Sequence, residues 1–165
     1  MRLHRSKGGI FTLVFVIVLV AFSSLIAEKS STPEAVKSEI YQLVRVIDGD
    51  TIEISRDGKV DSVRLLGIDA PEKDQCFYEE SKRALANLVG NNSLSLSTDP
   101  LNEDQDEYGR LLRYVYKNDI LVNEVLIKDG SAKYLSFFPI TLSNQFAELE
   151  KQAKENNLGL WNKCY

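Results

Sequence analysis

The pattern of apolar and polar positions changes twice along this chain of 165 residues. An apolar run comes first, a polar stretch follows, and from residue 40 onward segments with strand and helix periodicity take turns. Alternation of apolar and polar residues between turn signals predicts β-strands, because successive side chains of a strand point to opposite faces. Five strands are expected on this pattern, at residues 40–47, 51–58, 60–68, 93–99 and 111–119.

Apolar residues spaced three or four apart predict helices in the other segments. Three helices are expected, at residues 77–90, 120–130 and 141–161, the last with Gly159 as its stop, and a short extended piece is expected at residues 131–139. Thr141 or Ser143 is the expected N-cap of the last helix. Its inward face is expected to consist of Phe146, Leu149 and Ala153.

The order of these elements predicts an α+β domain that is mainly β. Asp57 and Gly58 form a favoured turn pair between the second and third strands, so the first three strands should form a meander. Five short strands with a helix between the third and fourth fit a five-stranded Greek-key barrel of the OB-fold type, with about three helices. The domain is expected to cover residues 40–165, preceded by a polar linker at residues 28–39 that contains Pro33.

The first 27 residues have the features of an export signal. Arg2, Arg5 and Lys7 precede an apolar run that begins at Ile10, and "AFS" supplies small residues for cleavage. An uncleaved anchor is the alternative, because residues 10–27 are just long enough to cross a bilayer as a helix. The protein is therefore expected to be secreted, or anchored to the outer face of the cytoplasmic membrane by this N-terminal apolar helix.

The charge balance restricts how the protein can hold a polyanion. The whole chain has 20 basic and 24 acidic residues. Without the three cations of the expected signal, 17 basic and 24 acidic residues remain, a net charge of −7. A broad basic surface for nucleic acid is excluded by this sign. Any site for a polyanion must concentrate its positive charge locally or take it from a metal ion.

Cysteine and histidine are rare in the chain. Cys76 and Cys164 are its two cysteines, and in an exported protein they predict a disulfide, with two separate thiols as the alternative. The one histidine, His4, lies in the expected signal. The remaining domain therefore has no histidine for a general base or a zinc site.

Three short stretches have charged residues where they could perform chemistry. "VIDGDTIEI" places Asp48 and Asp50 around a glycine, "VRLLGIDAPE" contains Arg64, and "DEYGRLLRY" contains Tyr108 and Arg110. Each stretch has a structural interpretation when taken alone: a turn stabilised by aspartate side chains, an arginine on the solvent face of a strand, and a turn that opens a strand.

Taken together and in this order, the stretches resemble the thermonuclease, or staphylococcal nuclease-like, family. The resemblance rests on "VIDGDT", "RLLGIDAPE" and "YGR", followed by "NEVLIKDGSAKY" and a terminal "GLW". It extends from about residue 40 to residue 161, nearly the whole chain after the expected signal. It implies an endonuclease that hydrolyses phosphodiester bonds of DNA and RNA with little sequence preference, leaving 3′-phosphate and 5′-hydroxyl ends.

The resemblance also implies one calcium ion and its ligands. Asp50 and Asp69 match the carboxylate ligands, and Ala70 matches a position that offers its main-chain carbonyl. Carboxylate and carbonyl oxygens without histidine suit calcium better than zinc. Alanine stands at residue 70 where relatives have threonine, a change that spares the carbonyl and removes a hydroxyl. Asp48 is expected to order the turn, or to act through water, without binding the metal directly.

The catalytic residues implied by the resemblance are Arg64, Glu72 and Arg110. Glu72 matches the residue proposed as general base or as organiser of the attacking water, and the two arginines match those that grip the phosphate and its developing charge. Pro71 is expected to fix the loop that carries Glu72. Such a set is needed for hydrolysis, whereas binding alone would not require it.

The residues expected to bind substrate depart in part from the family. Tyr108 matches a tyrosine of the nucleotide pocket, but Glu107 stands where relatives have a lysine and Ser136 where they have a second tyrosine. Tyr134, close to Ser136, is a further candidate. Single- and double-stranded DNA and RNA are the expected substrates of a monomer. The alternatives are a non-catalytic OB-type module that binds nucleic acid and a membrane-tethered interaction module.

Overall fold

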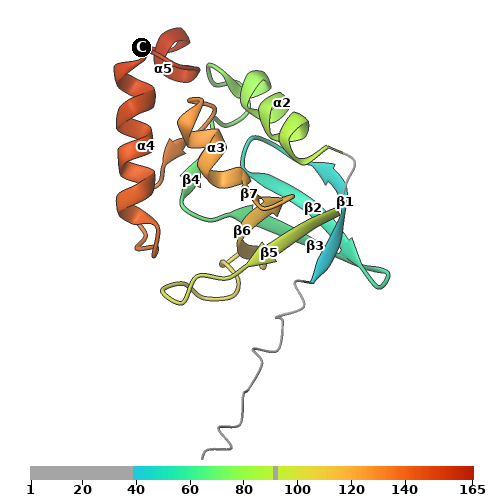
Figure 1. Cartoon of the computed structure of the whole chain (residues 1–165). Helices are drawn as coiled ribbons and strands as arrows, with labels where there is room; N and C mark the ends of the chain where they lie inside the picture. Colours follow the sequence, from blue (N-terminus) through green and yellow to red (C-terminus); the bar gives the residue numbers. More distant parts are fainter. Residues whose placement is uncertain (1–38, 91–92) are drawn as a thin grey trace, which may run out of the picture. The chain divides into compact units, whose positions relative to one another are not determined.

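The computed structural model describes residues 39–90 and 93–165 of the chain, and within them the strands form a closed barrel (Figure 1). The larger sheet has the strand order β3-β2-β1-β5-β6-β7, and β3 also pairs in parallel with β6, which closes it. Its strands are β1 (Ile40–Val46), β2 (Thr51–Arg56), β3 (Lys59–Leu65), β5 (Ser93–Ser97), β6 (Leu111–Lys117) and β7 (Ile120–Leu121). The mainly β barrel of the OB type predicted from the sequence is confirmed.

The core of the barrel follows the alternation that predicted the strands. In β2, Ile52 and Ile54 are fully buried, and in β3 Val63 and Leu65 are buried between less buried neighbours. Burying one such side chain stabilises the fold by roughly 1.5–3 kcal/mol, so these alternating positions fix which face of each strand is inside.

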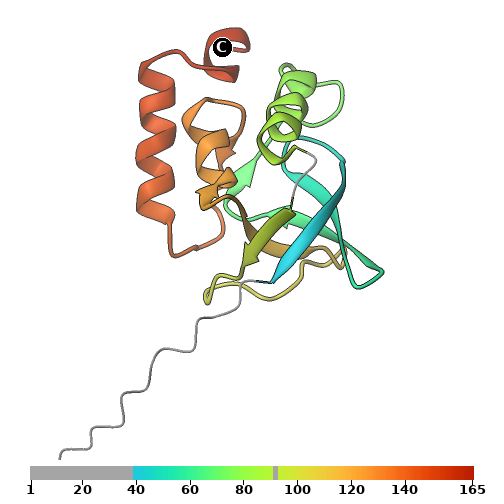
Figure 2. The same ribbon diagram turned by 45° about the vertical axis from the view of Figure 1, so that its right-hand side comes forward.

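Residues 39–90 and 93–165 contain four helices: α2 (Tyr78–Val89), α3 (Val122–Lys128), α4 (Ser143–Glu155) and α5 (Leu160–Lys163). Figures 1 and 2 show α3 between α2 and α4, and residues of α3 contact both neighbours. The expected inward face of the last helix is confirmed, since Phe146 and Ala153 are fully buried and Leu149 packs against the core.

The structure corrects several helix limits. The segment at residues 120–130 begins with the short strand β7, and α3 follows from Val122. The expected last helix is two helices, α4 and α5. The backbone of Gly159 has a φ of +53°, and a side chain there would clash with the carbonyl of Gly130.

The expected N-cap of α4 was wrong. Leu142 holds that position and makes no side-chain cap. The hydroxyl of Thr141 donates instead to Asp99, at 2.8 Å, and Ser143 is already the first helical residue. The Thr141 hydroxyl is therefore hydrogen-bonded to the buried carboxylate of Asp99 and does not cap α4.

A two-stranded ribbon lies beside the barrel, where the sequence predicted the end of the third strand and a short extended piece but not their pairing. It pairs β4 (Ile68–Asp69) with β8 (Lys133–Tyr134) in antiparallel fashion, with Asp69 opposite Lys133. The ribbon links the end of β3 to the segment between α3 and α4. A disulfide between Cys76 and Cys164, as expected from the sequence, ties the loop after β4 to the end of α5.

The expected signal or anchor at residues 1–27 and the linker up to residue 38 lie outside the described residues. Within residues 39–90 and 93–165, no helix is long and apolar enough to cross a membrane.

Candidate active site

The turn between β1 and β2 aims Asp50 into the protein. The carboxylate of Asp48 accepts a hydrogen bond from the amide of Asp50, at 3.0 Å, as an Asx-turn does. Gly49 lies so close to Ala70 and Ser81 that a side-chain carbon there would come within 2.6 Å and 2.8 Å of their Cβ atoms. The turn is thereby pressed against the loop after β4 and against α2, and Asp48 has the turn-ordering role expected of it.

Asp50 is a buried carboxylate, only 5% exposed, with three partners. It accepts hydrogen bonds from the amide of Ala70, at 2.8 Å, and from the hydroxyl of Thr51, at 3.0 Å. The guanidinium of Arg64 lies 3.1 Å away. Burial nevertheless raises the pKa of the Asp50 carboxyl to about 6, against the opposing effects of Arg64 and the two hydrogen bonds.

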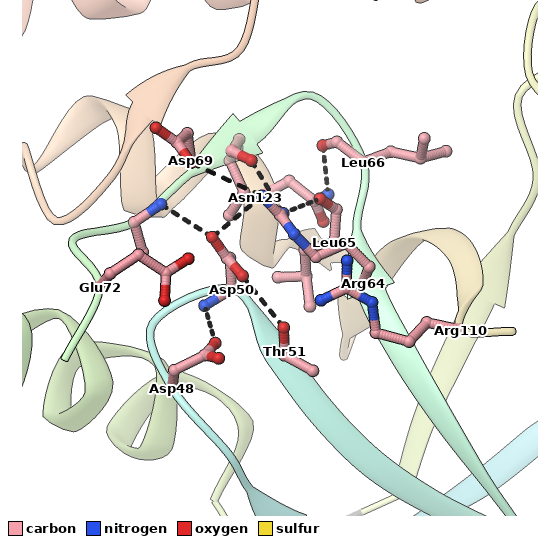
Figure 3. A network of polar contacts seen from close by, with 12 residues as sticks. Asp48, Asp50, Thr51, Arg64, Leu65, Leu66, Asp69, Glu72, Arg110 and Asn123 are labelled. Carbon is pink, nitrogen blue, oxygen red and sulfur yellow. Dashed lines mark hydrogen bonds and ion pairs between the residues drawn. The ribbon is translucent and has the colours of Figure 1, made fainter. Parts of the chain in front are cut away.

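Arg64 is held rigidly at the end of β3 (Figure 3). Its Nη1 donates to the carbonyls of Leu65 and Ile68, at 2.9 Å and 2.8 Å. Its Nη2 lies 3.1 Å from Asp50 and 3.8 Å from Asp69, so one nitrogen stands between two carboxylates. The arginine is therefore not on the solvent face of its strand: its side chain is 14% exposed and is fixed in place without substrate.

Asp69 and Glu72 are the exposed acids of the site. The side chain of Asp69 is half exposed at the end of β4, and Glu72 is exposed in the following loop. Gln75 stabilises that loop, because its side-chain carbonyl accepts the amide of Glu72 at 2.9 Å. Figure 3 shows Asp48, Asp50, Asp69 and Glu72 gathered in one region, with Arg64 beside them. The structure thus brings together the acids that the sequence singled out.

These acids fit a cation site with two carboxylate ligands. Among the described residues, no three side chains of the His, Cys, Asp and Glu types are arranged to hold a metal ion. Calcium, however, also accepts main-chain carbonyls and water as ligands, so a third acid is not required. Burial raises the pKa of Asp50, and a cation beside the carboxylate would favour its charged form.

Arg110 is positioned by Asp106, four residues before it. Its Nε and Nη2 both lie 2.7 Å from the same oxygen of Asp106, while the other oxygen accepts the amides of Tyr108 and Arg110. Partial burial alone would raise the pKa of the Asp106 carboxyl, but these hydrogen bonds and the charge of Arg110 lower it. The outer face of the guanidinium stays available for an anion.

Arg64 and Arg110 meet at one cavity of about 590 Å³. Tyr108, 76% exposed, stands at its wall with the Arg110 guanidinium 5.5 Å from its ring centre. Phe138, about half exposed, lines the cavity as well. Exposed aromatic rings beside guanidinium groups can stack on nucleobases while the phosphate is held.

The structure does not bring Tyr134 to this cavity. Its ring packs edge-on against buried Phe146, with centroids 6.2 Å apart, whereas Phe138 lines the cavity. Asp106 and Phe138 were not predicted as site residues. Asp106 left a signal, since an acid four residues before an arginine in "DEYGR" fits a pair across a turn. Phe138 left one as well, as an aromatic residue two positions after Ser136.

Fold and site together define an OB-fold protein with two arginines and a group of carboxylates at the edge of the barrel. The model of the staphylococcal nuclease homologue family matches residues 62–163, more than half of the chain. The chain belongs to this family.

Several relatives of known name agree with this assignment. The chain is 34% identical to a thermonuclease of Staphylococcus intermedius over 96% of this chain and 99% of that protein. It is 34% identical to the endonuclease YncB of Bacillus subtilis, over 82% and 69%. It is also 36% identical to the prophage-derived endonuclease YokF of the same species; that match covers 73% of this chain but only 43% of YokF.

Proposed function

We propose that this protein is a calcium-dependent nuclease that hydrolyses phosphodiester bonds of DNA and RNA, leaving 3′-phosphate and 5′-hydroxyl ends. The observation that carries the proposal is the convergence of Arg64 and Arg110 on one cavity beside Asp50 and Asp69. Membership of a nuclease family and the names of its relatives support a nuclease-type phosphodiesterase.

Each residue of the site has a role in this reaction. Glu72, exposed in its loop, takes a proton from water, and the oxygen of that water attacks phosphorus. The bond from phosphorus to the 5′ oxygen breaks, and that oxygen takes up a proton to become the 5′-hydroxyl. Arg64 and Arg110 stabilise the charge that builds on the phosphoryl oxygens, a task for which planar guanidinium groups are well shaped.

Asp50 and Asp69, with the main-chain carbonyl of Ala70, would hold the calcium ion. When bound, calcium supplies positive charge to the phosphate and favours hydroxide over water at the attacking position. The hydrogen bond from the Ala70 amide to Asp50 joins two of these ligands, so one local structure sets the positions of both.

Cleavage of a labelled single-stranded oligonucleotide by the full chain, with calcium and then with chelator, tests the proposal. Calcium-dependent cleavage is expected, and the end groups can be identified by mass spectrometry. Glu72→Gln should lower kcat by about 100-fold or more, as the loss of a general base typically does. Glu80→Gln, an exposed glutamate in the first turn of α2, is the matched control and should leave kcat unchanged.

Three outcomes would contradict the proposal: no cleavage with calcium, cleavage that survives the chelator, or full activity of Glu72→Gln. Retained binding of the oligonucleotide without any cleavage would point to the non-catalytic binding module instead.

We further propose that the protein is exported. Support comes from the sequence alone: Arg2, Arg5 and Lys7 before the apolar run at residues 10–27. Mass spectrometry of the protein from culture medium and from membranes distinguishes the two forms, since cleavage shortens the chain and an anchor leaves it whole. Intact protein found only in the cytosol would contradict export.

A further inference from the structure

A second groove, of about 230 Å³, is lined by Asp69, whose carboxylate lies 3.8 Å from Arg64 of the arginine cavity. Its lining includes Asp69, Gln75, Lys133, Tyr165 and the Cys76–Cys164 disulfide. We infer that this groove is a subsite for nucleic acid, in which the Lys133 ammonium binds the backbone phosphate next to the one being cleaved. The inference rests on the proposed nuclease function and extends it.

The β4–β8 ribbon places the groove within reach of the reacting phosphate. Gly67 and Leu135, at one end of the ribbon, line the arginine cavity. Asp69 and Lys133, two residues further along each strand, line the groove and lie opposite each other. Two residues of strand span about 7 Å. A strand of nucleic acid that crosses Asp69 therefore has its next phosphate close to Lys133.

Lys133 is held in place but keeps its hydrogen-bonding capacity. Its half-buried side chain extends over two aromatic rings, with Nζ 5.3 Å from the ring centre of Tyr165 and 5.9 Å from that of Trp161. Within the described part of the chain, no carboxylate lies within ion-pair distance of this nitrogen and no acceptor takes its hydrogens. Contacts with ring faces orient an ammonium and leave its N–H groups available for an anion.

Lys154 lies over the ring of Trp161 too, but it has a structural role. Its ammonium lies 4.4 Å from the ring centre of Trp161, but it is also paired with Glu150 at 2.7 Å. Among the residues that the structure describes, Lys133 has no such pair, and it is the one cation that lines the groove. Asp69, the acidic side chain among the described residues that line the groove, lies 3.8 Å from Arg64 and is a proposed ligand of calcium.

The groove's size favours a phosphate over a larger ligand. Pockets for drug-sized molecules typically hold about 300–1,000 Å³, and this groove is smaller. A backbone phosphate with part of its sugar fits such a space. We therefore assign the groove to the backbone of the substrate and no base recognition to it.

Short substrates that differ by a single phosphodiester test the subsite in the full chain with calcium. A dinucleotide has only the scissile phosphodiester, whereas two trinucleotides carry one more, charged but made resistant to cleavage, on its 5′ or its 3′ side. The wild-type protein should show a lower KM for one of the two trinucleotides than for the dinucleotide. Lys133→Gln should raise KM for that trinucleotide by about tenfold and leave the dinucleotide unchanged.

Two further variants sharpen the result. Lys133→Arg keeps the positive charge and should keep most of the advantage of the trinucleotide. Lys154→Gln, which removes the other cation at Trp161, should leave KM for every substrate unchanged. On long single strands, the slope of log KM against log salt concentration should fall by about 0.7 in Lys133→Gln, the value for one lost phosphate contact on a single strand.

A loss of activity in Lys133→Gln that is equal for all three substrates would overturn the subsite, because it would assign the lysine a purely structural role. No difference in wild-type KM among the three substrates would overturn it as well. Absence of any cleavage by the wild-type protein would contradict the proposed function itself, and the subsite with it; the two failures are thus distinguishable.

Discussion

Asp50 and Arg64 show how far single residues of the site depart from the solvent exposure expected of charged groups. A carboxylate that is 5% exposed and a guanidinium side chain that is 14% exposed face each other at 3.1 Å at the edge of an apolar core. Burying charges in this way costs free energy unless their partners are fixed, and here two main-chain carbonyls and one main-chain amide fix them. The protein thus holds its charged groups in position before any substrate arrives.

The buried carboxylate of Asp50 should make the metal-free protein less stable as the pH rises. Burial raises its pKa from 3.8 to about 6, so the folded protein keeps a proton that the unfolded chain releases at lower pH. The contribution to stability is full below about pH 4 and is lost as the pH rises through about 6. Asp50→Asn removes this dependence. Between pH 4 and pH 7, its free energy of unfolding should rise relative to wild type by up to about 3 kcal/mol.

Urea unfolding of both proteins at the two pH values, without metal, measures this difference. Calcium added at pH 7 should stabilise the wild-type protein and leave Asp50→Asn unaffected. Parallel pH curves for the two proteins would show that the burial of Asp50 has no such effect.

Asp106 should act as a positioning residue for Arg110. Asp106→Asn keeps the size of the side chain but loses the charge that holds the guanidinium at 2.7 Å. Charged hydrogen bonds contribute about 1.5–3 kcal/mol, so kcat should fall by about 10- to 100-fold with little change in KM. Asp104→Asn is the matched control, because Asp104 pairs with Arg113, which does not line the cavity. Equal kcat values for the two variants would contradict the role of Asp106.

At the scale of elements, the sequence predicted the strands and helices that a local apolar pattern determines. It missed the pairing of β4 with β8, which arises from packing. The five barrel strands were predicted because alternating apolar residues such as Ile52 and Ile54 have to face one core. The β4–β8 ribbon is only two residues long on each side, too short for any period, and it forms because the chain brings Asp69 and Lys133 together. Tyr134 was misplaced for the same reason: the ribbon turns its ring towards Phe146.

The candidate site was predictable as a set of residues and not as a geometry. The order of the motifs identified Asp50, Arg64, Asp69, Glu72 and Arg110. It could not show that one nitrogen of Arg64 stands between two carboxylates, nor that the amide of Ala70 donates to Asp50, because those contacts depend on how β2, β3 and β4 meet.

Gly49 joins three elements and should be intolerant of a side chain. In Gly49→Ala the new Cβ would come within 2.6 Å of Ala70 and 2.8 Å of Ser81. Overpacking of this kind typically costs about 1–3 kcal/mol of stability. The resulting shift of Asp50 should also lower kcat by about tenfold or more.

Gly58→Ala provides a contrast. Nothing lies within 4 Å of a side chain there, but the backbone φ is +82°, so the cost should be about 1 kcal/mol of strain with no change in kcat. Chemical unfolding and steady-state kinetics of both variants separate the two effects. Equal kcat for Gly49→Ala and wild type would show that the turn does not position the site.

At the scale of the whole molecule, the acidic composition and the substrate can be reconciled. With a net charge of −4, the chain cannot attract nucleic acid over a broad surface. Positive charge is instead concentrated at two places. Arg64 and Arg110 line one cavity, and Lys133 lines the second groove. A protein built this way should depend on a few local contacts and on its metal, and its binding should respond to salt only through those contacts.

The Cys76–Cys164 disulfide closes the domain around its active site. The two cysteines are 88 residues apart, and Cys76 follows Glu72 by four positions in the loop after β4. For a loop of this length the chain-entropy model predicts about 4–5 kcal/mol of stabilisation, as an upper value. The double variant Cys76→Ser, Cys164→Ser should therefore unfold at a clearly lower temperature. Its kcat should also fall at temperatures where it is still folded, because the loop that carries Glu72 loses its attachment to α5.

Thermal unfolding and kinetics, each with and without a dithiol reductant, check this prediction. Reductant should lower the unfolding temperature of the wild-type protein towards that of the double variant and leave the variant unchanged, which separates loss of the bond from the effect of the serines. If the variant kept the wild-type unfolding temperature, the bond would not stabilise the fold. A lower unfolding temperature with unchanged kcat would mean that the disulfide stabilises the domain and that Gln75, through the amide of Glu72, suffices to hold the catalytic loop.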